Sequence, residues 1–535
     1  MRKLIFCCLL SLAVLTATGH SQAPESSCSL KFRIKLGDAV AQTPVGGRLL
    51  VFMTTSKEER KVLGIEFIAG DTWVSAMEVE SIGPGQALEF DPDVKAYPKP
   101  FSRAPAGDYQ IMALLDPDHS YPYGGQDEGD LYSAVVKVNG LNPARTAPVD
   151  LVIDQRAQSR IKTNDTDSIK LGEFESPALS RFWGRPIKMQ AGVVLPPSFA
   201  KAPGKTYPTV YHVHGFGGDQ TSAWRQGARL IKAMADGKQM EMVHVFLNGH
   251  CPTGHHEFAD SINNGPWGQA LTQEFIPYLE RRFRLIPKAY ARFLTGHSSG
   301  GWSTLWLQVT YPDYFGGTWS TSPDPVDLHS FTGIDVTPGS KDNAYKTADG
   351  KTRNLIRMNG REISSIEEFA KLEEVLGDYG GQLASFEWVW SPKGEDGRPL
   401  KMFNRETGEI NPAIQRAWQK YDIRLILDQN WARLGPKLKG KVNVICGTDD
   451  TFHLEEAVKL LCAFFKQKGS DAVCELVPGR DHMNLYGAGP AYPEGLDQRI
   501  QKEMEHKFTI AAEAIRKSGR SKAVSAASQP SSGQH

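Results

Sequence analysis

The chain has 535 residues, of which 40% are hydrophobic, 10% aromatic and 23% charged. A chain of this length is too long for one ordinary domain, and this composition excludes wholesale disorder. Lys and Arg together number 61, and so do Asp and Glu, so the chain lacks the basic excess that favours nucleic-acid binding. We therefore expect at least two folded domains and no nucleic-acid partner.

Residues 1–23 have the pattern of an export signal. Two basic residues start it, residues 4–15 form a short apolar run, and small residues follow, with possible cleavage after Gly19 or Ala23. The run is too short to span a bilayer comfortably, and an uncleaved signal anchor is the alternative. We expect the mature protein to be secreted or periplasmic, with no membrane contact once the signal is removed.

Five of the seven cysteines remain after the signal: Cys28, Cys251, Cys446, Cys462 and Cys474. An oxidising compartment permits disulfides. Cys462 and Cys474 are the best candidates, because a predicted helix and the strand after it can bring them together. An odd number leaves at least one thiol free or bonded to another chain. No CxxC pair occurs, so we expect no structural zinc site of the usual spacing.

Residues 28–155 have the pattern of an all-β domain. Apolar or alternating runs are separated by turns that contain Gly and Pro, and no long helix is predicted. The runs are residues 30–34, 48–53, 109–115, 133–138 and 148–153. Short strands of this kind indicate a β-sandwich-like domain. Its role is either packing or binding to a substrate or wall, and the second role would favour a polymeric or surface-bound target.

Residues 156–184 are predicted to be a linker, after which the pattern changes over residues 185–516. Near-continuous apolar runs alternate with helical patterns, for example at residues 269–283 and 454–466. The expected strands are residues 190–195, 209–214, 242–247, 291–295, 317–320, 441–446 and 473–477. This alternation is typical of an α/β fold, with a mostly parallel sheet covered by helices on both faces.

The alternation stops at about residues 324–437. A segment of this length is too long for a plain loop, so we expect a cap or lid. It contains a helical pattern at residues 365–375 and four tryptophans, which either pack in its core or line a cleft. Residues 517–535 are rich in Ser, Ala and Gly, and we expect this tail to be disordered.

The sharpest motif is G-x-S-x-G at residues 296–300, between a predicted strand and a predicted helix. In this context Ser298 sits on a tight turn that projects its hydroxyl above the sheet, and the glycines let the strand and helix approach. The start of the helix offers amide donors to developing negative charge. The pattern predicts that Ser298 is a nucleophile.

A serine hydroxyl needs a base to take its proton. His482 follows the last predicted strand, and histidine can accept and then return a proton near neutral pH. The base in turn needs an acid that orients it. Asp450 follows the strand at residues 441–446 and is our candidate, with Asp449 as the neighbouring alternative. The order Ser298, Asp450, His482 is the one expected of α/β-hydrolases.

The oxyanion of such a reaction must be held by amide groups. The Gly-rich segment at residues 214–218 follows the strand at residues 209–214, and its open backbone can turn amides toward a substrate. We predict the N–H groups of Phe216 and Ser299 as donors, and His214 and Gly217 as substrate contacts.

Four motifs resemble those of the putative-esterase (esterase-D-like) family of α/β-hydrolases. They are residues 214–218, 296–301, 447–450 and 480–482. That family includes feruloyl and acetyl esterases, S-formylglutathione hydrolase, enterochelin esterases and mycolyltransferases. The resemblance covers about residues 185–515 and implies the family's catalytic roles for Ser298, Asp450 and His482. Ser299 stands where the family often has methionine, and the front module and the insert lie outside the common core.

A further segment, residues 249–268, follows the strand at residues 242–247 and contains three histidines, a cysteine and two carboxylates. Its spacing fits no standard metal site. We expect a loop that contacts or gates the substrate, with Trp267 as a possible wall. Metal binding and simple loop packing are the alternatives.

We therefore predict an α/β-hydrolase fold with a long cap insertion, preceded by an all-β sandwich-like domain. The predicted function is that of an exported serine hydrolase that needs no cofactor or metal and cleaves carboxylic esters through an acyl-enzyme on Ser298. An acyltransferase or a peptidase could use the same residues. The alternative from another class is a non-catalytic binding protein on a hydrolase fold.

Overall fold

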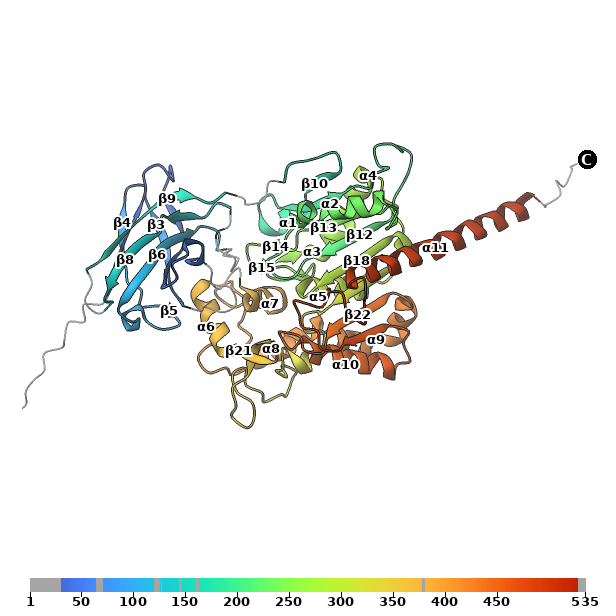
Figure 1. The fold of residues 1–535 in the computed structure, drawn as a ribbon. Helices are drawn as coiled ribbons and strands as arrows, with labels where there is room; N and C mark the ends of the chain where they lie inside the picture. The colour runs from blue at the N-terminus through green and yellow to red at the C-terminus, as the bar shows by residue number, and fades with distance from the viewer. Residues whose placement is uncertain are drawn as a thin grey trace, which may run out of the picture.

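The computed structural model describes residues 30–63, 71–119, 126, 128–143, 147–158, 163–377 and 381–527. Two large sheets dominate these residues, one in the front domain and one in the rest of the chain (Figure 1). The expected signal at residues 1–23 lies outside the described residues, as does Cys28. Within the described ranges, none of the helices has both the length and the apolar character that a membrane span requires.

Nine strands of the described residues form the front sheet. They are β1 (Phe32–Leu36), β2 (Val45–Thr54), β3 (Thr72–Ile82), β4 (Ala87–Phe90), β5 (Ala96–Tyr97), β6 (Gly107–Asp116), β7 (Leu131–Ser133), β8 (Val136–Leu141) and β9 (Val149–Arg156). Their order is β4-β1-β9-β7-β6-β2-β3-β5, and β8 also pairs with β6. Every predicted run of the front module overlaps a strand, so its β-rich character is confirmed.

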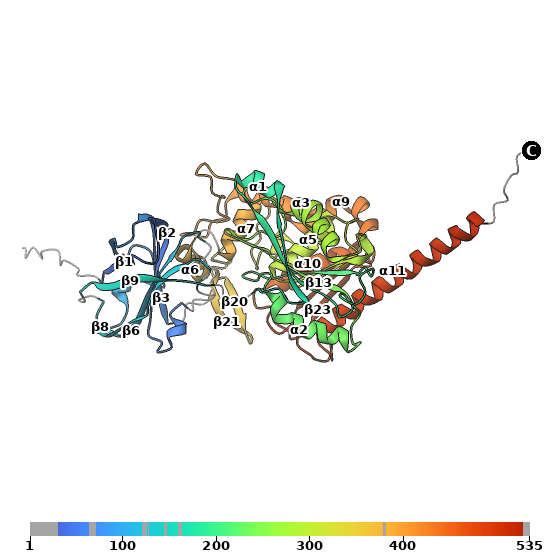
Figure 2. The ribbon, with the colours of Figure 1, turned by 90° about the horizontal axis from the view of Figure 1, so that it is seen from above.

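Strand β2 is buried on both faces. Leu49, Val51 and Met53 pack in the front domain's own core, whereas Leu50 and Phe52 pack in a second core that includes the cap. Successive side chains of a strand point to opposite faces, so one unbroken apolar run serves two cores. Helix α6 (Ile366–Leu376) of the cap lies against β3 on that second face (Figure 2).

Arg48 of β2 ties the front domain to the cap. Its buried guanidinium donates to the carbonyl of Val375 at 2.8 and 3.0 Å and to that of Glu374 at 2.7 Å. These carbonyls lie in the last turn of α6, where no partner within the helix is available. The guanidinium also pairs with Glu78 of β3. The front domain therefore serves as a support for the cap.

In the part of the chain that the structure describes, eight strands form the second sheet. They are β10 (Ile169–Glu175), β11 (Lys188–Val194), β12 (Thr209–Val213), β13 (Val243–Leu247), β18 (Arg292–His297), β19 (Gly317–Thr321), β22 (Val442–Gly447) and β23 (Val473–Val477). The order is β10-β11-β13-β12-β18-β19-β22-β23. The strands from β13 to β23 are parallel, and β10 and β11 are antiparallel. All seven predicted strands are confirmed.

Helices cover both faces of this sheet, as predicted. On one face lie α2 (Ser222–Ala235) and α11 (Leu496–Ala527). On the other lie α3 (Trp267–Ala270), α4 (Ile276–Phe283), α5 (Ser299–Thr310), α9 (Ile423–Leu438) and α10 (Leu454–Gln467), with a π-helical segment at Leu271–Phe275. This is the α/β-hydrolase arrangement, so the predicted fold class is confirmed.

Two segments differ from their predictions. Part of the expected linker, residues 169–183, forms edge strand β10 and helix α1 (Pro177–Trp183). Ile169 packs against α2. The strand is only partly buried, so it also contains polar residues, and these led to the prediction of a linker. The expected disordered tail is helical as far as Ala527, because its Ala, Lys and Arg residues are good helix formers. In Figure 1 this end of α11 extends away from the body.

The predicted disulfide is confirmed. Cys462 of α10 and Cys474 of β23 are bonded, with their Cα atoms 5.6 Å apart. The bond joins a helix on one face of the sheet to the edge strand beside it. Cys251 and Cys446 are free thiols.

The cap lies between β19 and α9. It contains η5 (Leu328–Ser330), β20 (Asn354–Met358), β21 (Arg361–Ser365), α6, α7 (Gln382–Trp390), α8 (Pro412–Ala417) and η6 (Trp418–Tyr421). The ring of Trp390 lies 5.1 Å from the rings of both Trp302 and Trp418, and all three are fully buried. These tryptophans therefore join the cap to α5. The predicted insertion reached residue 437, but α9 packs against α5 and belongs to the sheet's helices.

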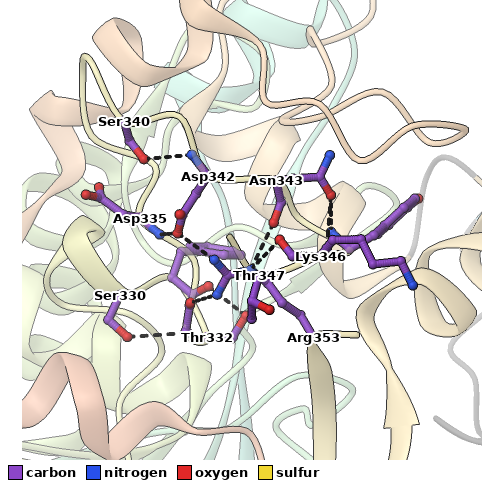
Figure 3. A network of polar contacts seen from close by, with 12 residues as sticks. Ser330, Thr332, Asp335, Ser340, Asp342, Asn343, Lys346, Thr347 and Arg353 are labelled. Atoms are coloured by element: carbon purple, nitrogen blue, oxygen red, sulfur yellow. Dashed lines mark hydrogen bonds and ion pairs between the residues drawn. The ribbon is translucent and has the colours of Figure 1, made fainter. Parts of the chain in front are cut away.

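Arg353 organises the cap loop that precedes β20. Its guanidinium donates to the carboxylate of Asp342 at 2.8 Å and to the carbonyl of Asn343 at 2.9 Å, and it also binds the carbonyl of Gly333 (Figure 3). The carboxylate of Asp342 accepts a further bond from the N–H of Asp335 at 3.0 Å. One cation thus holds a long loop that has little regular structure.

We expect Arg48→Ala to destabilise the protein. The change leaves buried carbonyls at the end of α6 without their donor, which costs on the order of 1–3 kcal/mol. Urea unfolding measures the loss. Arg33→Ala is the matched control, because Arg33 lies in the same sheet but is 56% exposed, and it should change stability by less than about 0.5 kcal/mol. Equal losses for the two variants would contradict a supporting role of Arg48.

Candidate active site

Ser298 occupies a strained turn between β18 and α5. Its backbone has φ 59° and ψ −126°, a conformation that L-residues rarely adopt. The neighbouring positions must be glycine, because no room is left there for a Cβ atom. A Cβ at Gly296 would lie 2.1 Å from the carbonyl oxygen of Gly300, and one at Gly300 would lie 2.1 Å from that of Val213. The predicted nucleophile elbow is present in the backbone.

Asp450 and His482 meet at the same edge of the sheet. Nδ1 of His482 donates to Oδ2 of Asp450 at 2.8 Å, and both side chains are buried. Burial opposes ionisation of Asp450, but the charge of His482 and the hydrogen bonds from His482 and from the N–H of Phe452 outweigh it, so the pKa of Asp450 lies below its usual value. The structure joins Asp450, and not Asp449, to the histidine.

The acid is held from outside by Arg357, which sequence reasoning missed. Its guanidinium donates to the carbonyl of Asp450 at 3.0 and 3.1 Å and pairs with Glu455 at 2.7 Å. Arg357 lies in β20, so the cap itself fixes the turn that carries the acid. No motif in the cap marks this arginine.

His482 lies beside His297, the residue that precedes Ser298. The ring of His482 lies 4.3 Å from that of His297 and 4.9 Å from that of Phe452. The hydroxyl of Ser298, however, donates to Oδ1 of Asp324 at 3.5 Å, and among the described residues no hydrogen bond joins it to His482. Catalytic hydrogen bonds are often loose before substrate binds and tighten in the complex.

Asp324 is the acidic residue that sequence reasoning missed. Its Oδ2 accepts from the hydroxyl of Ser299 at 2.6 Å, and its side chain is only 2% exposed. Burial raises its pKa from the usual 3.8 to about 6, with a smaller contribution from the charge of Asp450. Asp324 follows β19, whose carboxyl end lies beside that of β18. That position was the available signal, because strands β18, β19 and β22 all end at this edge.

The predicted oxyanion segment lies against the nucleophile. Strand β12 pairs with β18 in parallel register, and a Cβ at Gly215 would lie 3.1 Å from the Cβ of Ser298. Gly217 has φ 76° and forms the turn that Phe216 enters. His214 is held neutral, because burial lowers its pKa to about 4. It lines a cavity of about 490 Å³ between α2 and α11, whose wall also includes Gly215 and His297.

The loop at residues 249–268 is packed rather than open. The ring of Trp267 stacks on that of His256 at 3.7 Å, its N–H donates to the carbonyl of Asn264 at 2.9 Å, and it is 6% exposed. Trp267 thus packs in the core, and its role as a wall of the substrate site stays a prediction. Within the described ranges, no His, Cys, Asp and Glu side chains gather in threes as metal ligands would.

This loop is tied to the cap above it. The hydroxyl of Ser261 donates to the carbonyl of Trp388 at 3.0 Å. The side-chain amide of Asn263 donates to the carbonyl of Ser391 at 2.8 Å. Both acceptors lie at the end of α7. The loop therefore supports the cap instead of gating a cleft, which is the packing alternative.

A small apolar pocket in the cap reaches the candidate catalytic residues. Its volume is about 40 Å³, and Asp324 and Phe452 form part of its wall. Asp324 touches Ser298, and the ring of Phe452 lies against His482. Apolar cap residues form most of the remaining wall, among them Phe331, Ile334, Leu355, Leu383, Phe386 and Met402. The pocket is therefore suited to the apolar part of a substrate.

The sheet order and the elbow define an α/β-hydrolase. The family model for the putative esterases matches residues 184–482, more than half of the chain. The chain therefore belongs to the putative esterase family, and it is a carboxylic-ester hydrolase.

Solved structures of esterases are similar to this chain. A ferulic acid esterase is 16% identical with a TM-score of 0.40, and the match covers 64% of this chain and 98% of that one. An S-formylglutathione hydrolase from Staphylococcus aureus is 17% identical with a TM-score of 0.37 over the same shares. A ferulic acid esterase from Anaeromyces mucronatus is 16% identical with a TM-score of 0.31, covering 60% of this chain and 88% of that one.

We expect Asp324→Asn to stabilise the protein at high pH. Because the folded-state pKa of about 6 lies above the usual 3.8, the carboxyl favours folding below pH 3.8, and that contribution is lost as the pH rises through 6. The shift corresponds to about 3 kcal/mol. Urea unfolding from pH 4 to pH 8 should show a gain for the variant that grows across this window. A gain that is the same at every pH would contradict burial of a titrating Asp324.

Proposed function

We propose that the protein is an exported serine esterase in which Ser298, His482 and Asp450 act as a catalytic triad. The observation that carries the proposal is the buried hydrogen bond of 2.8 Å between His482 and Asp450, beside the strained turn of Ser298. Membership of the putative esterase family supports it.

The bond to Asp450 selects the tautomer of His482. Because a carboxylate can only accept, Nδ1 carries the proton and Nε2 is left as the basic nitrogen. After the hydroxyl of Ser298 rotates away from Asp324, Nε2 takes its proton while the oxygen attacks the ester carbonyl. The tetrahedral oxyanion is held by the amides of Phe216 and Ser299.

The two half-reactions then follow from this geometry. The imidazolium returns its proton to the leaving alcohol, and the acyl group remains on Ser298. Water next gives a proton to His482, attacks the acyl carbonyl and releases the carboxylic acid, and Ser298 recovers its proton. The cap encloses the apolar pocket beside this centre, which supports a dry site in which the oxyanion donors act strongly.

The proposal of export rests on residues 1–23, which have the pattern of a cleaved signal. The disulfide between Cys462 and Cys474 supports it, because such bonds persist in oxidising compartments. That the ester is carried on a polymer or surface stays a prediction. The contact of the front domain with the cap favours support of the cap as that domain's role.

We expect Ser298→Ala to reduce hydrolysis of an aryl acetate by at least about 1,000-fold, because the nucleophile is lost while the oxyanion donors remain. The release of the aryl alcohol measures the rate. Ser320→Ala is the matched control: Ser320 is a buried serine in β19 whose hydroxyl binds the carbonyl of Gly301, and this variant should keep most of the activity. A Ser298→Ala protein as active as its parent would refute the triad.

We also expect the mature chain to be found outside the cytoplasm, with a start after Gly19 or Ala23. Expression of the full chain in a bacterial host, followed by fractionation and sequencing of the first residues, measures this. Replacing Arg2 and Lys3 by glutamate removes the positive start of the signal and should hold the uncut chain in the cytoplasm. An intact chain that is cytoplasmic in both forms would sink the proposal of export.

A further inference from the structure

Asp324 is a buried acid without a cation of its own. In the part of the chain that the structure describes, its partners are the hydroxyls of Ser298 and Ser299, and no ion pair includes it. The nearby cationic candidate, His482, is engaged by Asp450. By contrast, buried Asp327 is paired with Arg424 at 2.9 Å. Buried charges in proteins are normally paired or neutralised, so Asp324 lacks a partner that a ligand could supply.

A second buried acid, Glu257, is coupled electrostatically to Asp324. It is fully buried, its Oε2 accepts from Ser303 at 2.8 Å, and its Oε1 has no hydrogen-bond partner. Nδ1 of His255 lies 3.6 Å from Oε1, but it accepts the N–H of Glu257 and so offers only a lone pair. Burial, followed by the charge of Asp324, raises the pKa of Glu257 well above its usual value. Glu257 therefore holds its proton and leaves Asp324 as the charged group.

The position of Asp324 limits where a ligand cation can be attached. A reacting carbonyl carbon must come within about 3 Å of the oxygen of Ser298. Oδ1 of Asp324 lies 3.5 Å from that same oxygen. An ester that Ser298 attacks therefore lies beside Asp324, and a donor attached near its carbonyl carbon, for example on the α-carbon, can reach the carboxylate.

The pocket limits what else the acyl group carries. Apart from Asp324, Thr332 and Gln382, its wall is apolar, with Phe331 and Leu383 among the residues. Its volume of about 40 Å³ is roughly three times the 10–15 Å³ that a cavity needs to hold one water molecule. This space suits a small aliphatic side chain better than an aromatic one.

We propose that Asp324 binds a protonated amine on the carbon next to the scissile carbonyl, so that the preferred substrates are esters of small aliphatic α-amino acids. The inference rests on the proposed function of Ser298 and adds the acyl group that this site selects. The ammonium supplies the missing cation to Asp324, and the aliphatic side chain enters the cap pocket. With the ammonium in place, the carboxylate no longer opposes the oxyanion that forms on attack by Ser298.

Three ethyl esters test this inference on the full mature chain at pH 7, where an α-amine is mostly protonated. They are L-valine ethyl ester, ethyl (S)-2-hydroxy-3-methylbutanoate and ethyl 3-methylbutanoate, which differ only in the group on the α-carbon. Released ethanol gives kcat/KM for each. We expect the parent to prefer the amino ester to the hydroxy ester by about 10- to 100-fold, the range of a hydrogen bond between charged groups.

Two variants separate recognition from general damage. In Asp324→Asn the preference for the amino ester should fall to about 1, because the amide carries no charge. Asp422→Asn is the matched control. Asp422 is also buried, burial raises its pKa to about 6, and it accepts the N–H groups of Leu425 and Leu328; asparagine keeps the cap of α9 at Leu425 and gives up the bond from Leu328. This control should keep the preference of the parent.

The outcomes are distinct. Equal rates for the amino and hydroxy esters in the parent would overturn the inference and make Asp324 a plain hydrogen-bond acceptor, and this result does not depend on whether Asp324→Asn folds. A preference that survives in a folded Asp324→Asn protein would overturn it as well. Hydrolysis of ethyl 3-methylbutanoate that is lost in Ser298→Ala would meanwhile uphold the proposed function. If Ser298→Ala hydrolyses all three esters as fast as the parent, the proposed function itself fails.

Discussion

The hydrogen bond between Asp450 and His482 is the interaction on which the site depends, and it requires two loops to meet at one edge of the sheet. Strands β22 and β23 are parallel, so both loops leave at the same edge. A Cβ at Gly447 would lie 2.0 Å from the carbonyl of Arg480, and the N–H of Asp449 donates to that carbonyl at 3.0 Å. Glycine at residue 447 therefore lets the two loops touch, and the acid reaches the histidine because of that contact.

The cap and the front domain extend this requirement through the rest of the molecule. The cap supplies Arg357, which holds the turn of Asp450, and its tryptophans continue the core under α5. The cap is in turn held by the front domain, through the outer face of β2 and through Arg48. The front sheet thus holds the cap in place, and the cap in turn holds the turn that carries Asp450. A domain that lies outside the hydrolase core still bears on the geometry of its site.

Sequence patterns predicted the parts of the site that follow strand ends. The strands are continuous apolar runs, and Ser298, Asp450 and His482 lie in short motifs just after three of them, so parallel topology alone brings them to one edge. Asp324 also follows a strand, but it has no glycine motif around it. The pocket was out of reach, since its wall combines residues from separate cap segments, such as Phe331, Ile366 and Leu383, that no motif links. Sequence alone does not separate packing from binding for Trp267, because aromatic residues in a loop serve both equally well. Residues 49–53 are apolar without a break, which is typical of a strand that is buried on both faces. A sandwich with one core needs only one apolar face, so this run was an available sign of the second core.

Asp450 and Asp324 show how environment gives two buried carboxyls opposite properties. Both lie beside the same centre, at the ends of neighbouring strands. Asp450 receives a charge-assisted bond from His482 and an amide bond, so its pKa is lowered in spite of burial. Among the described residues, the donors to the carboxylate of Asp324 are hydroxyls, so burial dominates and its pKa is raised. Pairs of acids whose environments separate them in this way commonly divide the work of an active site. Here the paired acid serves the base. The unpaired acid, Asp324, is unfavourable to ionise while the site is empty. In the proposed complex, the ammonium of the acyl group lowers the free energy of the ionised carboxylate.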